Sequence, residues 1–370
     1  MRLVVAGGGT GGHLFPGIAV AEEFLARDKG NEALFVGTEH GIEARVLPRL
    51  GFRMELIVAS GIRGKNFFSQ FKGFLMLLYG YAQARRILKT FKPDRVLGVG
   101  GYASAPIVLA AGGMRIRRFI HEQNAIPGLT NKFLARFAER VFVSIEESEQ
   151  FFPKEKTVLT GNPIRKEILA EVLKMGNRPK PSFDKENGPS QRGDFRLLVF
   201  GGSAGAHSIN MNIIAALPFL SHFREKVSIT HQTGEKDLLE VREAYQRQGF
   251  RADVIPFIDN MANAYSSADL IVCRAGATTV AEVTACGKPC IFIPYPHAVD
   301  DHQRRNAEAL LKRNAGFMLL ERELSGESLA KLIGELIDNP GSVEMTGRNA
   351  AKLGQLDAAR VIVDEMMKSG

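Results

Sequence analysis

The stretch Leu3-Val4-Val5-Ala6-Gly7-Gly8-Gly9-Thr10-Gly11-Gly12-His13 decides the fold. Its four apolar residues predict a short buried strand, its glycines predict a tight turn, and the apolar residues from Ile18 to Leu25 predict a helix. A strand, a turn and a helix in this order form one unit of a parallel α/β sheet. The turn brings main-chain N–H groups at a helix N-terminus close to a ligand, which suits a phosphate or an oxyanion.

The same order of elements recurs in the second half of the chain. Leu197-Leu198-Val199-Phe200 predicts a strand that leads into Gly201-Gly202-Ser203-Ala204-Gly205-Ala206. Further apolar runs predict strands at residues 33–36, 95–99, 119–120, 141–143, 227–230, 253–255, 270–273 and 290–293. We therefore expect an α/β fold with two Rossmann-like, doubly wound domains, and a ligand cleft between them at the carboxyl ends of their strands.

Chain length and composition also favour two domains. The sequence has 370 residues and 45% hydrophobic content, which is more apolar material than one ordinary core holds. We place the first domain at 1–163, with a closing helix at about 346–368 that packs back on it, and the second domain at 164–345. Residues 179–194 are rich in Pro, Lys, Asn, Gly and Ser, and we expect a polar loop there.

The net charge of +8 lies in the N-terminal half. Residues 1–165 hold 23 Lys and Arg against 14 Asp and Glu, whereas residues 166–370 hold 25 against 26. Such a half can face an anionic membrane, a phosphorylated ligand or nucleic acid. The three cysteines have no zinc or disulfide spacing and suit a reducing cytoplasm. The apolar run before Gly7 is too short for a signal peptide, and we expect no membrane-spanning segment.

The segment from Gly61 to Lys89 combines aromatic and basic residues and has no acidic residue. Its apolar residues recur at helical spacing, a pattern that core packing also produces. A broad aromatic face ringed by Lys and Arg is typical of a helix in the headgroup region of an anionic bilayer. We expect the membrane face to include Lys65, Phe67, Phe71, Lys72, Phe74, Leu75, Leu78, Arg85 and Arg86.

The first glycine turn matches two nucleotide-binding patterns only in part. A nicotinamide enzyme needs an acidic residue at the end of its second strand, and Gly37-Thr38 follows that strand here. A P-loop needs Lys and then Ser or Thr after its last glycine, where His13-Leu14 stands. The first mismatch disfavours a dehydrogenase, and the second excludes a P-loop NTPase.

His13 is the candidate general base. A neutral imidazole beside a glycine turn can accept a hydroxyl proton, although a helix-capping or positioning histidine would occupy the same place. His121 and Glu122 follow another predicted strand and form a competing base or acceptor clamp, with Glu122 as the alternative base.

Six motifs occur in order along the chain: Gly98-Val99-Gly100-Gly101-Tyr102-Ala103-Ser104, His121-Glu122-Gln123-Asn124-Ala125-Ile126-Pro127-Gly128, Gly161-Asn162-Pro163-Ile164-Arg165, Gly201 to Ala206, Arg274-Ala275-Gly276-Ala277-Thr278-Thr279-Val280-Ala281-Glu282, and His302-Gln303-Arg304-Arg305-Asn306-Ala307. Together they resemble the family of bacterial N-acetylglucosaminyltransferases that convert undecaprenyl-diphosphate-MurNAc-pentapeptide, lipid I, into lipid II, the disaccharide precursor of peptidoglycan. The resemblance covers nearly the whole chain; only the polar segment at 179–194 departs from it.

The resemblance implies a GT-B glycosyltransferase that transfers GlcNAc from UDP-GlcNAc to the C4 hydroxyl of MurNAc with inversion. The first domain would bind the acceptor and the second the donor. The implied diphosphate contacts are Arg165 and Ser203, the uracil contact is Ile258, and the ribose contact is Glu282. The full set on the donor side is Thr10, Gly11, Gly12, Asn124, Arg165, Ser203, Ile258, Ala277, Thr278, Thr279, Val280, Ala281, Glu282 and Gln303, and that on the acceptor side is Tyr102 and His121.

The resemblance also implies a peripheral location on the cytoplasmic face of the inner membrane, a role in cell shape and division, and partners among other cell-wall synthesis proteins. The chain has no Asp-x-Asp pair, so we expect no metal and no cofactor, with the diphosphate held by helix N-termini and Arg165. The alternatives are a UDP-GlcNAc epimerase or another UDP-sugar-dependent GT-B enzyme. A membrane or nucleic-acid adaptor would not need the C-terminal nucleotide motifs, and we expect no nucleic-acid partner.

Overall fold

The computed structural model describes residues 1–39, 41–59, 67–176, 194–202 and 205–368, with the backbone alone at 67–75 and 175–176. It divides into two compact units. Unit 1 comprises Met1–Arg165 and Gln355–Gly370, and unit 2 comprises Lys166–Gly354. Ile164 and Arg165, which we expected to open the second domain, therefore lie in unit 1.

Unit 1 is built on a seven-stranded sheet in the order β3-β2-β1-β4-β5-β6-β7, in which every pair of neighbours is parallel. The strand order reverses between β1 and β4, so the loops after these two strands lie next to each other. The strands are β1 Arg2–Ala6, β2 Glu32–Gly37, β3 Arg53–Leu56, β4 Arg95–Gly98, β5 Arg117–Glu122, β6 Arg140–Val143 and β7 Thr157–Leu159.

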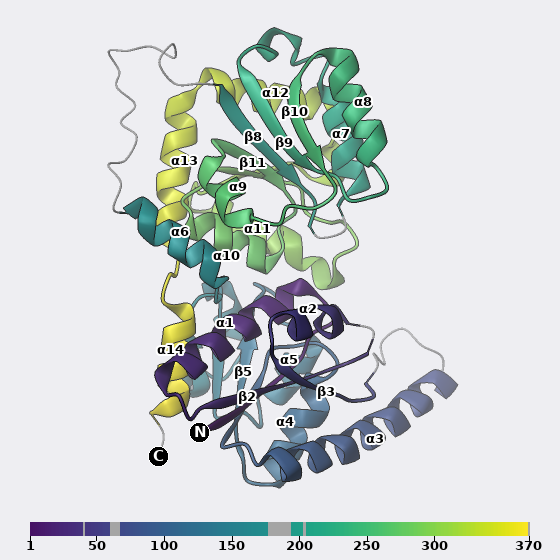
Figure 1. Ribbon diagram of the computed structural model, residues 1–370, viewed down its shortest axis with the longest axis vertical. Helices are drawn as coiled ribbons and strands as arrows, with labels where there is room; N and C mark the ends of the chain where they lie inside the picture. The colour runs from purple at the N-terminus through teal and green to yellow at the C-terminus, as the bar shows by residue number, and fades with distance from the viewer. Residues whose placement is uncertain (40, 60–66, 177–193, 203–204, 369–370) are drawn as a thin grey trace. The chain divides into compact units, whose positions relative to one another are not determined.

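Helices cover both faces of this sheet (Figure 1). Alternate residues of the strands point to opposite faces, so Val4 packs in one core and Val5 in the other. The first core also takes side chains from α3 Phe67–Phe91, α4 Ser104–Gly113 and α5 Leu129–Leu134. The second takes them from α1 Gly11–Arg27, α2 Glu43–Arg49 and α14 Ala358–Met367.

The closing helix expected at about 346–368 is two helices in different units. α13 Pro340–Leu353 belongs to unit 2, and the chain then breaks at Gly354 before α14 begins. Gly354 packs closely against the backbone of unit 2, because a Cβ there would lie only 2.9 Å from the Ala285 Cα. α14 lies alongside α1 in unit 1 (Figure 1).

Unit 2 repeats the design with six parallel strands in the order β10-β9-β8-β11-β12-β13. Its order reverses between β8 and β11. The strands are β8 Phe195–Phe200, β9 Val227–Gln232, β10 Arg251–Ile255, β11 Leu270–Cys273, β12 Cys290–Phe292 and β13 Phe317–Met318. The helices are α6 Lys166–Gly176, α7 His207–Ala216, α8 Leu238–Gln248, α9 Met261–Ser267, α10 Ala277–Ala285, α11 His302–Leu311, α12 Gly326–Asp338 and α13.

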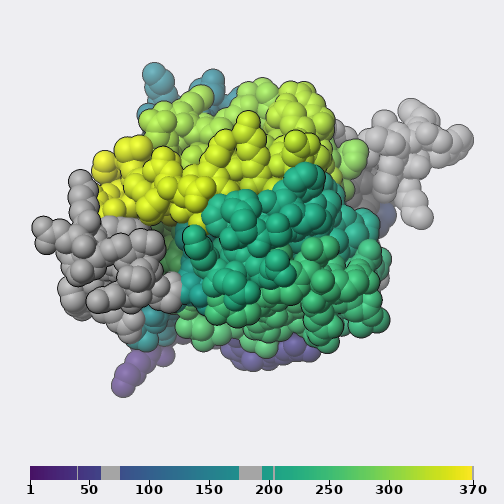
Figure 2. Space-filling model, turned by 90° about the horizontal axis from the view of Figure 1, so that it is seen from above, coloured from purple at the N-terminus to yellow at the C-terminus, as the bar shows by residue number. Residues whose placement is uncertain are grey.

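One face of this second sheet packs against α7, α8 and α12 in a single apolar core. α12 contacts α7 and α13 contacts α10. In Figure 2, the yellow-green surface of the later part of unit 2 lies beside the teal and green surface of its earlier part. The two doubly wound sheets confirm the predicted fold class. In the described part of the chain, no helix is both long enough and apolar enough to cross a membrane.

Candidate functional site

The predicted site residues of unit 1 gather where its strand order reverses. The glycine turn 7–12 follows β1, the loop 99–103 follows β4, and His121 and Glu122 end β5. Ser104 fastens the first two loops together. Its hydroxyl donates to the Ala6 carbonyl at 2.7 Å and accepts from the Gly100 N–H at 3.0 Å. The loops pack so closely that a Cβ at Gly7 would overlap the Gly100 carbonyl.

Glu43, which the sequence did not single out, anchors the glycine turn from below. This carboxylate is 1% exposed and accepts hydrogen bonds from the Gly9 N–H at 2.7 Å, the Thr38 N–H at 3.0 Å and the Thr38 hydroxyl at 3.2 Å. A Cβ at Gly8, Gly37 or Gly41 would run into it. The N–H of Gly9 is therefore directed to a protein carboxylate. No motif in the sequence marks Glu43, which follows Gly41 by two residues.

His13 is held by a chain of hydrogen bonds through the interior of unit 1. Its Nδ1 lies 3.0 Å from the Gln123 Oε1, and the Gln123 Nε2 lies 3.0 Å from the Nδ1 of His121. The Nε2 of His121 faces the Ser144 hydroxyl at 3.1 Å. His121 is 1% exposed, and burial lowers its pKa to about 4. His121 thus lies beneath the surface of unit 1, and its contact with the acceptor stays a prediction.

Glu122, the alternative base, is committed to its own loop. It is 1% exposed, and its carboxylate accepts from the Asn124 N–H at 3.0 Å, the Gly128 N–H at 3.2 Å and the Asn131 amide at 2.9 Å. These bonds fix the conformation of the loop that carries Asn124. The geometry favours a positioning role for Glu122, and leaves His13, which is half-buried, as the better candidate for a base.

The second glycine turn, 201–206, follows β8 at the reversal point of unit 2. Gly205 has φ +76°, and a Cβ there would collide with the Thr233 carbonyl. Below it, the amide of Asn210 donates to the Thr233 carbonyl at 2.9 Å and to Asp237 at 2.7 Å. Ser203, the predicted diphosphate contact in this turn, lies outside the described residues, as do residues 179–193 of the polar loop predicted at 179–194.

A buried histidine supports this turn from inside unit 2. The Nε2 of His231 lies 3.1 Å from the Asn210 Oδ1, and its Nδ1 lies 3.0 Å from the Tyr245 hydroxyl. Burial lowers the pKa of His231 to about 3 and raises the pKa of Tyr245. Both groups are neutral near pH 7, and they form a polar network within an otherwise apolar core.

α10 begins directly after Gly276 and carries the run predicted to meet the nucleotide. Its N-terminus offers main-chain N–H groups, and Thr278, Thr279 and Ala281 are half-buried, whereas Ala277 and Val280 are buried. Glu282 is 1% exposed, and its Oε2 accepts from the Tyr265 hydroxyl at 3.0 Å. The structure thus adds Tyr265, which sequence reasoning missed, as the partner that orients this carboxylate.

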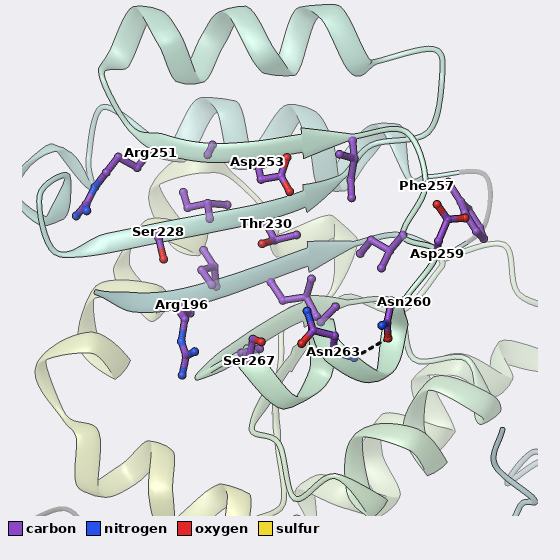
Figure 3. A pocket seen from close by; sticks show the side chains of 18 residues that line it. Arg196, Ser228, Thr230, Arg251, Asp253, Phe257, Asp259, Asn260, Asn263 and Ser267 are labelled. Atoms are coloured by element: carbon purple, nitrogen blue, oxygen red, sulfur yellow. Dashed lines mark hydrogen bonds between the residues drawn. The ribbon is translucent and has the colours of Figure 1, made fainter. Parts of the chain in front are cut away.

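A groove of about 660 Å³ runs along the face of β8, β9 and β10 next to α9 (Figure 3). Arg196 and Arg251 mark one end of it, and Phe257 and Asp259 mark the other. Ile258, the predicted uracil contact, lines the groove and is 6% exposed.

Gln303, one of the predicted donor-side residues, lies at the start of α11. Its Oε1 accepts from the Tyr295 N–H at 3.0 Å. The structure holds Arg274, also in this unit, by bonds to the Ile293 and Pro294 carbonyls and to Glu321. Arg274 therefore ties the ends of β11 and β12 together.

The remaining predicted residues of unit 1 lie on its surface. Thr10 precedes α1 and is exposed, Gly11 and Gly12 open that helix, and Tyr102 is 61% exposed. The guanidinium of Arg165 stacks over the Phe15 ring at 5.1 Å, which places this arginine beside α1.

The predicted membrane face falls largely where side chains are not described. Lys65 and the side chains of Phe67, Phe71, Lys72, Phe74 and Leu75 lie outside the described residues. Leu78 is 50% exposed and Tyr79 is 59% exposed, Arg85 is half-buried and Arg86 is exposed.

No three His, Cys, Asp or Glu side chains in the described ranges come together in a way that could hold a metal ion. The expectation that no metal takes part remains a prediction.

Comparison with known proteins gives consistent matches over the full length. One relative, from Geotalea uraniireducens (strain Rf4), is 68% identical over 100% of this chain and 98% of its own length, and another, from Geobacter metallireducens, is 65% identical over 100% and 99%. Both are named UDP-N-acetylglucosamine–N-acetylmuramyl-(pentapeptide) pyrophosphoryl-undecaprenol N-acetylglucosamine transferase.

Solved structures give the same result. The crystal structure of Acinetobacter baumannii MurG covers 99% of both chains with a TM-score of 0.79 and 32% identity. A UDP-GlcNAc 2-epimerase from Neisseria meningitidis reaches a TM-score of 0.67 over 100% of both chains at 14% identity, which shows a shared fold alone. The models of the glycosyltransferase family 28 N-terminal and C-terminal domains match residues 3–143 and 196–362. The chain therefore belongs to glycosyltransferase family 28.

Proposed function

We propose that this chain transfers N-acetylglucosamine from UDP-GlcNAc to the C4 hydroxyl of MurNAc in undecaprenyl-diphosphate-MurNAc-pentapeptide, the step that converts lipid I into lipid II. The observation that carries the proposal is the 68% identity, over 100% of this chain and 98% of the relative, to a protein named for this reaction. An epimerase is not favoured, because the likeness to epimerases is one of fold at 14% identity.

The reaction is a direct displacement with inversion. The C4 oxygen of the acceptor forms a bond to the anomeric carbon of GlcNAc, and the bond from that carbon to the β-phosphate oxygen breaks with its electron pair moving to UDP. His13 takes the hydroxyl proton. Its half-buried position after the glycine turn, and the hydrogen bond that holds its Nδ1, support this role.

Unit 2 carries the groups proposed to hold the donor. The N-terminus of α10 presents main-chain N–H groups, which stabilise negative charge and therefore favour the diphosphate of the leaving UDP. Glu282 accepts hydrogen bonds from the ribose hydroxyls, and the Tyr265 hydroxyl orients its carboxylate. Ile258 contacts the uracil from the end of the groove beside α9.

Transfer of radiolabelled GlcNAc to a lipid-linked MurNAc acceptor tests the function. Label in the lipid fraction that depends on the acceptor supports it, whereas UDP-GlcNAc turnover without an acceptor would indicate an epimerase. His13→Ala should lower kcat more than it weakens UDP binding, because the base acts in the chemical step and not in donor recognition. Equal losses in both would remove His13 from the base role.

Unit 1 also carries the proposed membrane contact, on the inner leaflet beside the lipid acceptor. Leu78 and Tyr79 are exposed apolar side chains on α3, with Arg86 and Lys89 exposed further along the same helix. In liposome co-sedimentation, Leu78→Ser with Tyr79→Ser should reduce binding to anionic vesicles. Leu239→Ser, at a 65% exposed position in unit 2, is the matched control. Equal binding to neutral vesicles would count against the contact.

A further inference from the structure

The hydrogen-bond partners of Gln123 determine which nitrogen of His13 carries the proton. Gln123 is 1% exposed and directly follows β5, and its side chain lies between the loop after β4 and the His13 ring. Its Nε2 lies 2.9 Å from the Val99 carbonyl. A carbonyl oxygen can only accept a hydrogen bond, so the amide nitrogen must face Val99 and the amide oxygen must face His13.

The same orientation directs the second hydrogen of this amide towards His121. The Gln123 Nε2 also lies 3.0 Å from the Nδ1 of His121, which must then accept. His121 can accept at Nδ1 because burial keeps it neutral, with a pKa of about 4. Its proton is then on Nε2, which faces the Ser144 hydroxyl at 3.1 Å and the Gly161 carbonyl at 3.5 Å.

The amide oxygen in turn sets the state of His13. Because Oε1 can only accept, the Nδ1 of His13 at 3.0 Å must carry a hydrogen. A neutral imidazole has one N–H, so its Nε2 is left with the lone pair, which is the form that accepts a proton. Gly100 makes this contact possible: at φ +94°, a Cβ would lie 2.9 Å from the Nδ1 and Cε1 of the ring.

We propose that Gln123 is a positioning residue that, oriented by Val99 and neutral His121, holds His13 with its proton on Nδ1 and its Nε2 ready to take the acceptor's hydroxyl proton. This inference rests on the proposed function for its catalytic consequence. When the C4 hydroxyl loses its proton to Nε2, His13 becomes an imidazolium that still donates from Nδ1 to Gln123. No rearrangement of the amide is needed during the reaction.

The direct test is the tautomer of His13 in the resting protein, measured by two-bond ¹H–¹⁵N correlation NMR on ¹⁵N-histidine-labelled full-length protein. The chain has eight histidines, and the His13→Gln variant identifies the signals of His13 by their loss. We expect a protonated Nδ1 and an unprotonated Nε2. An Nε2–H tautomer in the wild type would overturn the inference whatever the variants do.

Gln123→Met supplies the second measurement, because it keeps a similar side-chain volume and removes both the donor and the acceptor. We expect the His13 signals to show a mixture of tautomers, and kcat to fall about tenfold, the factor expected for one lost hydrogen bond, with KM for UDP-GlcNAc unchanged. Phe91→Leu, a core change elsewhere in unit 1, controls for lost stability and should keep both the tautomer and kcat.

The outcomes separate this inference from the proposed function. Normal GlcNAc transfer with an unchanged His13 tautomer in Gln123→Met would refute the positioning role alone. An Nδ1–H tautomer in a wild-type protein that transfers no GlcNAc would refute the proposed function and leave the hydrogen-bond geometry standing. If Gln123→Met does not fold, the tautomer of His13 in the wild-type protein still tests the inference.

Discussion

Replacing Glu43 by Ala should loosen the first glycine turn and destabilise unit 1. The carboxylate accepts three hydrogen bonds, from the main chain of Gly9 and from the main chain and hydroxyl of Thr38. Hydrogen bonds to a charged group contribute about 1.5–3 kcal/mol each when buried. Gly9 is exposed and Thr38 half-buried, so water replaces part of this, and we expect a loss of about 3 kcal/mol in all.

For a domain of this size, that loss corresponds to a decrease in Tm of about 6–12 °C. The chain has no tryptophan, so thermal unfolding is best followed by far-UV circular dichroism, with hydrogen exchange of the amides in residues 1–39 to assign the transition to unit 1. Glu39→Ala removes the same charge from an exposed position four residues earlier and should change the free energy of unfolding by less than about 0.5 kcal/mol. If Glu43→Ala had the same Tm as Glu39→Ala, the Glu43 carboxylate would not stabilise the turn.

Three further predictions follow from unit 2 and the buried histidines. The pKa values of His121 and His231 in the folded protein are about 4 and about 3, below the ordinary 6.5, so the unfolded chain binds protons at a higher pH than the folded protein does. The free energy of unfolding should therefore be greatest above pH 6.5 and decline towards pH 4 and then pH 3. In a plot of Tm against pH, His231→Gln should flatten the lower part of the profile. Gly205→Ala should abolish UDP-dependent thermal stabilisation, because its Cβ would collide with the Thr233 carbonyl at φ +76°; retained stabilisation would show that the turn can adapt. Tyr265→Phe should raise KM for UDP-GlcNAc about tenfold or less with kcat little changed, since it removes one hydrogen bond from Glu282, and a fall in kcat alone would contradict the binding role.

The fold could be predicted from the sequence because its central strands are continuous apolar runs flanked by glycine turns. The strands that the sequence missed, β3, β7 and β13, lie at or near sheet edges and carry few buried residues. Arg53-Met54-Glu55-Leu56 in β3 has no buried side chain and so no periodic signal. The prediction also missed the break at residues 354–357 in the expected closing helix; this break begins at Gly354, where a Cβ would lie 2.9 Å from the Ala285 Cα.

The sequence predicted the motifs of the candidate site but not the residues that hydrogen-bond to them. His13 stands out because it follows a glycine-rich turn, and Glu282 because it ends the motif that begins at Arg274. Their partners, Gln123 and Tyr265, are polar residues whose importance comes from contacts 110 and 17 residues away in the chain. His121 looked like an acceptor contact because it ends a strand, but residues 119–122 of β5 are all buried, since helices cover both faces of the sheet. The sequence alone does not show whether a polar residue at the end of a strand is buried or exposed to a ligand.

The return of α14 to unit 1 sets an order of events during synthesis. Ile362, Val363 and Met366 fill the core under α1, and the Arg95 guanidinium donates to the Met366 carbonyl at 2.6 Å. Since α14 follows all of unit 2 along the chain, the ribosome must deliver Lys166–Gly354 before unit 1 can close this apolar surface. The apolar surface of unit 1 that α14 covers therefore stays exposed on the nascent chain until unit 2 has been synthesised, and such a surface is one that chaperones bind.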